Sequence, residues 1–296
     1  MDKFLMDFIE YLTIEKEMSQ NSLDAYRRDV REFERIIREK QNLSLREASK
    51  TEIVSYLLQL KNEGKSAATI NRKIASLRAF YNFITEKNHI AENPVANIKS
   101  PKIERKAIDY LTIEEIENLL STPDDTIKGS RDRAILELLY ATGIRVSELV
   151  EMNVEDVNLR MGFVTCTGEH GKARIIPMGR PSRSAVEEYI FEIRPKYIKD
   201  TEKAEKALFL NFSGERLTRQ GLWKIMKEYA KGAGIEHKLT PQVLRNSFAV
   251  HMIQNGADVK SLQELLGHED ISATQIYLSV SKNRIKEVYD KAHPRA

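Results

Sequence analysis

Cysteine is nearly absent from this chain, because Cys166 is the only one among 296 residues. A single cysteine cannot form a disulfide within the chain, which is consistent with a reducing cytosol. The six histidines and this cysteine also lack the spacing of metal ligands. We therefore expect no metal cofactor.

Long apolar runs and a basic leader are missing too. No stretch approaches the ~18 consecutive apolar residues that a membrane-spanning helix needs. The first ten residues, MDKFLMDFIE, interleave acidic and apolar groups, whereas a signal peptide has a basic start and an unbroken apolar core. We therefore expect a cytoplasmic protein without membrane contacts.

A strong charge of either sign is also absent. Lys and Arg number 47 and Asp and Glu number 44, which gives a formal net charge of +3. This balance does not by itself demand a nucleic-acid partner, so any DNA-binding surface must be local. The composition, 41% hydrophobic and 31% charged, is that of a globular protein, and the length favours two domains with separate cores.

Helical periodicity dominates the first third of the sequence. Apolar residues at three- and four-residue spacing, such as Phe4, Phe8 and Leu12, predict a first amphipathic helix. Further helices are expected over residues 22–40, 51–64 and 66–84. Residues 1–98 are therefore predicted to form a four-helix domain without strands, followed by a basic linker over residues 99–110.

The remaining residues, 111–296, are predicted to form a second, mainly helical domain. Thr112 followed by Glu115 has the pattern of a capping box at the start of its first helix. Residues 163–167 and 173–177 flank a glycine-bearing turn and predict a β-hairpin, the one pair of strands expected. Helices are expected over residues 116–120, 131–140, 183–193, 219–230, 241–254, 259–266 and 282–291.

Three segments of the second domain combine arginine, histidine and tyrosine. They read ATGIRVSEL over residues 141–149, TPQVLRNSFAVH over residues 240–251 and LLGHEDISATQIY over residues 265–277. Together they resemble the three boxes of the tyrosine recombinases of the phage integrase family, in the family's order, and the likeness is to the Xer branch. The first domain resembles the family's core-binding domain, so the resemblance covers nearly the whole chain.

This resemblance implies a fold and an activity. The fold would be mainly α, with an N-terminal four-helix core-binding (SAM-like) domain and a C-terminal α+β catalytic domain that contains a small β-hairpin sheet. The activity would be that of a site-specific recombinase, an enzyme that cuts and rejoins DNA strands. No cofactor is implied, because a covalent protein–DNA bond keeps the energy of the phosphodiester and makes ATP unnecessary. Roles in DNA recombination, DNA integration, chromosome partition and cell division belong to the same resemblance.

The resemblance also implies roles for four side chains. Tyr277 would attack the DNA phosphorus to form a 3′-phosphotyrosyl bond, and it must lose its proton as it attacks because a phenol has a pKa of ~10. Arg145 and Arg245 would bind the non-bridging oxygens, since a guanidinium stays charged and offers a planar fork of donors. His268 would donate a hydrogen bond to the phosphate or help to move protons. Taken singly, each residue could instead be a packing or surface residue, but that explanation does not account for the set.

The chain departs from the family pattern in the hairpin turn and in the second box. Glu169 stands where the family has a lysine that protonates the leaving oxygen, and Lys172, across the turn, is either its replacement or a surface charge. Gln242 stands where the family has histidine or lysine, and it can donate a hydrogen bond but cannot exchange a proton. Asn246 replaces a common histidine at a position that we expect to matter less. Glu148 either supports the site arginine or is a helix-surface carboxylate.

These departures leave two activities open. Losing one acid–base group typically costs ~10²- to 10⁴-fold in rate. The chain is therefore either a recombinase, slowed by these replacements, or a catalytically silent DNA-binding relative that acts as a regulator or partner subunit. A helical protein-interaction scaffold is a third class, but it leaves the motifs unexplained.

Double-stranded DNA is the expected partner. Five basic side chains of the second and fourth helices are candidates for phosphate contacts, with a solvated helix face as the alternative for each: Arg27, Arg28, Arg72, Lys73 and Arg78. The resemblance implies one domain on each side of the duplex and self-assembly into a synaptic tetramer, alone or with a related recombinase. The predicted last helix, 282–291, would pack on a neighbouring protomer or on its own.

Overall fold

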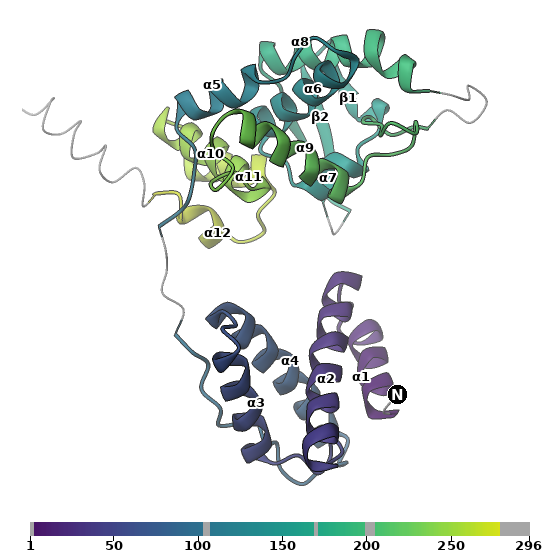
Figure 1. Ribbon diagram of the computed structural model, residues 1–296, viewed down its shortest axis with the longest axis vertical. Coiled ribbons are helices and arrows are strands. Elements are labelled where there is room, and N and C mark those ends of the chain that lie inside the picture. The colour runs from purple at the N-terminus through teal and green to yellow at the C-terminus, as the bar shows by residue number, and fades with distance from the viewer. Residues whose placement is uncertain (1–2, 103–106, 169–170, 199–204, 279–296) are drawn as a thin grey trace, which may run out of the picture. The chain divides into compact units, whose positions relative to one another are not determined.

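The structure is a computed structural model that describes residues 3–102, 107–168, 171–198 and 205–278. Glu169 and the predicted helix over residues 282–291 lie outside the described residues. The chain divides into two compact units, residues 1–106 and 107–296 (Figure 1). Among the described residues, no helix combines the length and the apolar composition that crossing a membrane requires.

The first unit consists of four helices, as the periodicity predicts. They are α1 (Lys3–Ile14), α2 (Gln20–Gln41), α3 (Lys50–Asn62) and α4 (Ala67–Glu86). Three of them begin at a serine whose hydroxyl accepts a backbone N–H of the first turn: Ser19, Ser49 and Ser66. Because each serine hydroxyl satisfies a backbone N–H that has no partner within the helix, the three helices begin at these serines.

Aromatic rings fill the core of the first unit. Phe8, Phe33 and Phe80 are fully buried, and the rings of Phe8 and Phe80 meet edge to face with centroids 5.4 Å apart. The start of the predicted linker also lies against this unit, because Asn71 of α4 donates to the carbonyl of Pro101 at 2.9 Å. Just before the linker, Arg78 of α4 donates to the carbonyl of Ile98 at 2.8 Å. That bond gives Arg78 a structural partner within its own unit.

The second unit is mainly helical and contains one small sheet. Its helices are α5 (Ile113–Ser121), α6 (Ile127–Thr142), α7 (Val146–Glu151), α8 (Arg180–Glu188), α9 (Arg219–Gly232), α10 (Pro241–Gln254), α11 (Val259–Leu266) and α12 (Ser272–Gln275), with short turns η1 (Val154–Asp156), η2 (Tyr189–Ile193) and η3 (Arg194–Tyr197). The predicted capping box is confirmed: the Thr112 hydroxyl accepts from the Glu115 N–H at 3.2 Å, and the Glu115 carboxylate accepts from the Thr112 N–H at 2.9 Å.

The sheet contains the predicted hairpin and one additional strand. Strands β1 (Val157–Asn158), β2 (Phe163–Thr167) and β3 (Ala173–Pro177) pair antiparallel in that order. Val164, Cys166 and Ile176 are buried, so alternate residues of β2 and β3 face the core. The predicted fold class, mainly helical with a small sheet in the second unit, is confirmed.

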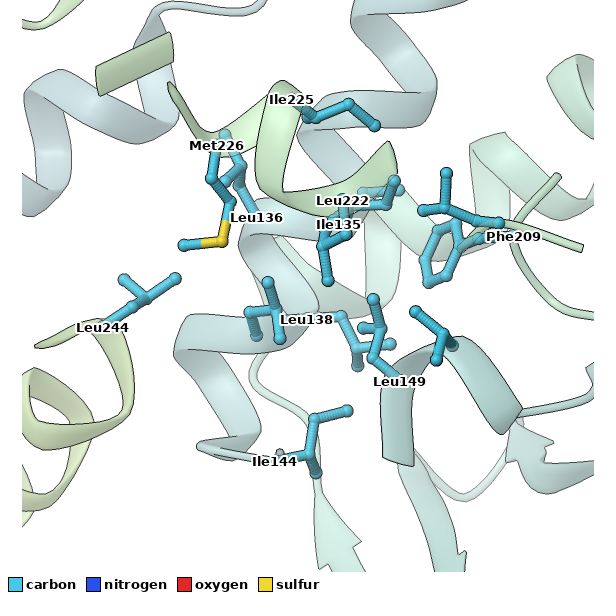
Figure 2. Packing of buried hydrophobic residues seen from close by; sticks show 14 of the residues in the cluster. Ile135, Leu136, Leu138, Ile144, Leu149, Phe209, Leu222, Ile225, Met226 and Leu244 are labelled. Carbon is cyan, nitrogen blue, oxygen red and sulfur yellow. The ribbon is translucent and has the colours of Figure 1, made fainter. Parts of the chain in front are cut away.

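Helix α6 lies at the centre of the second unit. Its residues Ile135, Leu136 and Leu138 pack among side chains of α7, α9 and α10, which include Leu149, Leu222, Met226 and Leu244 (Figure 2). Even its polar residues Arg131 and Asp132 are buried. Because α6 is enclosed, its C-terminal end is held firmly, and the loop that follows it carries Arg145.

Candidate active site

The C-terminal end of α11 holds three arginines. The last carbonyls of a helix have no partner within the helix and carry partial negative charge, so guanidinium donors suit them. The three donors come from β3, α10 and the N-cap of α7 and bind three successive carbonyls. The bonds run from Arg174 Nε to Leu265 (2.8 Å), from Arg245 Nη2 to Leu266 (2.6 Å) and from Arg145 Nη2 to Gly267 (3.1 Å).

Gly267 is the residue that allows this convergence. It ends α11 in the left-handed conformation, with φ of 63°, which glycine adopts without steric cost. A Cβ at this position would lie 2.9 Å from the guanidinium carbon of Arg174. Backbone conformation and space therefore both require glycine here.

Glu148 of α7 is buried and binds two of the arginines. Its Oε1 accepts from Arg145 Nη1 at 3.2 Å and from Arg174 Nη1 at 2.7 Å, and its Oε2 accepts from Arg174 Nη2 at 2.9 Å. Burial raises the pKa of this carboxyl, but the hydrogen bonds from Arg174 and from the Arg145 backbone outweigh it and hold the pKa below its usual range. Of the two possibilities that the sequence left open, Glu148 is the support and not a surface carboxylate.

Arg245 is 5% exposed and lies deeper than Arg145. It donates to the carbonyl of Gly143, at the end of α6, and to His268 Nε2 at 3.1 Å. Burial and the neighbouring Arg145 lower the pKa of Arg245 to about 10. The group remains positively charged at neutral pH.

His268 is held as a neutral imidazole. Arginine has no acceptor, so Nε2 of His268 must accept from Arg245, and Nδ1 then carries the proton and donates to Thr274 Oγ1 at 2.9 Å. Burial, together with the charges of Arg245, Arg145 and Arg174, lowers the pKa of His268 to about 4. In this arrangement the imidazole presents an acceptor to Arg245, not a donor to a phosphate.

A cavity of about 670 Å³ lies beside this cluster. Its lining side chains include Arg145, Lys172, Arg174, Glu264, His268 and Glu269. The fold therefore brings Lys172 from the hairpin to the same cavity as Arg145 and His268. Arg245 is not a lining residue and adjoins the cavity through its bond to His268.

Tyr277 is not a lining residue of that cavity. It is 1% exposed and packs in a cluster with Phe248 and Leu266, while its hydroxyl donates to Asn246 Oδ1 at 3.1 Å. Burial raises the pKa of the phenol, and the charge of Arg245 acts against that shift. In the part of the chain that the structure describes, no hydrogen bond joins this hydroxyl to Arg145, Arg245 or His268.

Gln242 also turns toward Asn246 rather than toward the cavity. Its side chain is exposed, one helical turn before Asn246, and its Nε2 donates to Asn246 Oδ1 at 2.8 Å. The second-box position where the family has histidine or lysine is thus engaged with an amide in this structure.

The basic residues predicted on α2 and α4 have different surroundings. Lys73 is 4% exposed and pairs with buried Asp29 at 3.3 Å and with the partly exposed Glu32 at 2.7 Å, so it neutralises carboxylates of its own unit instead of facing solvent. Arg72 also pairs with Asp29, but its side chain is 44% exposed. Arg27 pairs with Asp24, and Arg28 is exposed beside a surface groove on α2.

Sequence reasoning missed the contributions of Arg174 and Asn246. Arg174 lies two residues before the buried Ile176 in β3. Residues two apart in a strand point to the same face, so Arg174 occupies an inward-facing position. A charged residue at an inward position must find partners, and that signal could have identified it. For Asn246, the sequence offers no comparable pattern, since Gln242 is its one local partner and the other two, Tyr277 and Asp109, lie 31 and 137 residues away.

Comparison with known proteins agrees with this geometry. The phage integrase family matches residues 109–284, and the phage integrase N-terminal SAM-like domain matches residues 5–88. Tyrosine recombinase XerD of Oceanobacillus iheyensis is 44% identical over 291 residues, 98% of each chain, and XerD of Staphylococcus haemolyticus is 43% identical over the whole of both chains. The structure of XerH site-specific recombinase bound to a difH substrate shares the fold, with a TM-score of 0.76 at 22% identity over 96% of this chain and 83% of that one. The chain therefore belongs to the phage integrase family of tyrosine recombinases.

Proposed function

We propose that this chain is a site-specific DNA recombinase that cuts and rejoins strands through a 3′-phosphotyrosyl bond to Tyr277. One observation carries the proposal: three guanidinium groups converge at the end of α11, beside a cavity that Lys172 and His268 also line. An excess of fixed positive charge at a cavity suits the anionic transition state of phosphoryl transfer. The close relatives named XerD support the same activity.

The arrangement assigns each side chain a task. Arg145, whose side chain is 37% exposed, binds a non-bridging oxygen of the phosphate, and the buried charge of Arg245 stabilises the developing negative charge electrostatically. The Tyr277 oxygen forms a bond to phosphorus and passes its proton to solvent water, while the bond from phosphorus to the 5′-oxygen breaks. Lys172 supplies a proton to that leaving oxygen, in place of the lysine absent at position 169. Rejoining reverses these steps with the 5′-hydroxyl of a second strand.

The first unit supplies DNA affinity in this proposal. Residues 1–98 form the DNA-binding domain and residues 99–110 the linker to the catalytic domain. Arg27, Arg28 and Arg72 contact phosphates, whereas the buried Lys73 and Arg78, which binds the carbonyl of Ile98, support the fold of that domain. The protein would act in the cytoplasm, on double-stranded DNA, as a synaptic tetramer alone or with a related recombinase.

A suicide substrate tests the activity. Duplex DNA that the protein selects from random sequence is nicked near the cleavage point, so that the cut strand cannot rejoin and a covalent adduct accumulates. We expect an adduct with the wild type and none with Tyr277→Phe. Tyr229→Phe is the matched control, because it removes a buried hydroxyl that binds Asp132 at 3.0 Å, away from the cavity. An equal adduct yield from Tyr277→Phe would refute the assignment of the nucleophile.

A catalytically silent DNA-binding protein is the second candidate. The buried Tyr277 hydroxyl and the replacement at Gln242 favour it. That function predicts sequence-specific binding of the selected DNA and no adduct with the wild type, which the same assay distinguishes.

A further inference from the structure

The side chain of Asn246 joins three parts of the second unit. Its Oδ1 accepts from the Tyr277 hydroxyl at 3.1 Å and from Gln242 Nε2 at 2.8 Å. Its Nδ2 donates to the carbonyl of Asp109 at 3.0 Å. A single amide thus connects the proposed nucleophile with the segment through which the chain enters this unit.

That entry segment lies along α10 next to Tyr277. The backbone N–H of Leu111 donates to Ser247 Oγ at 2.8 Å, one residue after Asn246. Ile108 and Tyr110 pack against the apolar cluster that contains Tyr277. The hydroxyl of Tyr277 and the entry segment are therefore fixed by neighbouring residues of one helix.

This position of Tyr277 is incompatible with attack. Tyr277 is 1% exposed and does not line the cavity, and its hydroxyl donates its hydrogen bond to Asn246. An attacking phenol must point an oxygen lone pair at phosphorus with about 3–3.5 Å between the reacting atoms. The hydroxyl must leave Asn246 before it can reach a phosphate beside Arg145.

We propose that Asn246 is a positioning residue that holds Tyr277 in a resting place and that its release is a step on the path to cleavage. This inference rests on the proposed function. An amide suits the task because it accepts from the phenol and donates to the Asp109 carbonyl at the same time, with no change of protonation. Release then depends on movement of the chain and not on pH.

Two substitutions of Asn246 should change the cleavage rate in opposite directions. Asn246→Leu removes the acceptor at similar volume, and single-turnover adduct formation on the suicide substrate should rise about fivefold, the factor that one ordinary hydrogen bond represents. Asn246→Asp keeps an acceptor, loses the donor and adds a negative charge that disfavours the phenolate, so adduct formation should fall severalfold. A purely structural role would slow both variants, and that result would overturn the proposal.

Asn118→Leu is the matched control. It makes the same exchange and loses the same kind of side-chain bond, from Asn118 Nδ2 to the Ala233 carbonyl at 3.1 Å, at a distance from Tyr277 along the chain and on another helix. Its adduct formation should equal that of the wild type. Acceleration by Asn118→Leu as large as that of Asn246→Leu would show a general loosening and would also overturn the proposal.

A spectroscopic readout separates this inference from the activity itself. Full-length protein carrying 3-fluorotyrosine is titrated by ¹⁹F NMR, and the resonance of residue 277 is identified by its loss in Tyr277→Phe. The phenol pKa should fall in Asn246→Leu and rise in Asn246→Asp. If no variant forms an adduct but these shifts occur, the proposed function fails while the hydrogen bond to Asn246 stands; unchanged titrations refute the role of Asn246 even if cleavage occurs.

Discussion

Two basic clusters, one in each unit, are built on opposite charge balances. In the first unit, Arg72 and Lys73 meet two carboxylates, Asp29 and Glu32, so the charges cancel. At the end of α11, three arginines stand beside one carboxylate among the described residues, Glu148, which pairs with Arg145 and Arg174, and each arginine also donates to a carbonyl at the helix end. Neutral hydrogen-bond partners hold an arginine in place without removing its charge.

The comparison explains which cluster suits catalysis. A compensated cluster stabilises its domain and leaves only the exposed side of Arg72 for a phosphate. The uncompensated cluster keeps a positive potential at the cavity. Burial first, and the neighbouring arginines second, lower the pKa of Arg245 to about 10 and that of His268 to about 4. Preorganised charge of this kind needs no rearrangement when an anionic transition state forms.

Replacing one arginine in each cluster should give the largest difference. Arg145→Ala removes a donor at the cavity, so cleavage of the suicide substrate should fall about 10²- to 10³-fold with DNA bound at saturation. Arg72→Ala should leave cleavage of saturated DNA unchanged and instead weaken binding, with the slope of log affinity against log salt reduced by about 1. A large loss of saturated cleavage in Arg72→Ala would contradict the distinction between the two clusters.

The sequence predicted those elements whose apolar residues recur with the period of a helix or a strand. The four helices of the first unit and the hairpin follow from periodicity, and α7 and β1 were missed because six and two residues are too short to show a period. Helix α6 extends beyond its predicted 131–140 because it is enclosed on most sides and buries polar residues such as Asp132, which weakens the amphipathic signal.

The site was predicted only as a set of residue types. The boxes identified Arg145, Arg245, His268 and Tyr277, and the structure brings the first three together at α11. The bond of Arg174 to Leu265 joins residues 91 positions apart, so no local pattern reveals it. The resting position of Tyr277 depends on Asn246, which the box pattern marks only as the replacement of a common histidine at a position expected to matter less.

Gly267→Ala should have a smaller effect. It separates the cost of a side chain at positive φ from the cost of displacing the Arg174 guanidinium. A methyl group there meets the Arg174 guanidinium at 2.9 Å in addition to the positive φ, so we expect about 1–2 kcal/mol of lost stability and a several-fold slower cleavage as Arg174 and the carbonyls shift. Gly234→Ala is the control, because Gly234 has φ of 71° with nothing within 4 Å of the added atom. It should lose similar stability by chemical denaturation and keep its cleavage rate; equal slowing in both would mean that the arginine contact is unimportant.

The pH dependence of stability gives the smallest expected effect and tests whether burial and the neighbouring arginines together keep His268 neutral. The folded-state pKa of His268 is about 4, whereas an unfolded histidine titrates near ~6.5. Between these values the unfolded chain binds a proton that the folded chain rejects, so the stability from the neutral imidazole is present above pH 6.5 and is lost as the pH falls toward 4. His268→Gln should lower this slope by up to about one proton, whereas His237→Gln, at an imidazole that is 94% exposed, should not.

Urea unfolding followed by the fluorescence of Trp223, the only tryptophan and a residue of α9, reports on the second unit. An unchanged slope in His268→Gln would mean that neither burial nor the three arginines at the end of α11 disfavours a further positive charge there, and the contrast between the two clusters would then lose this support.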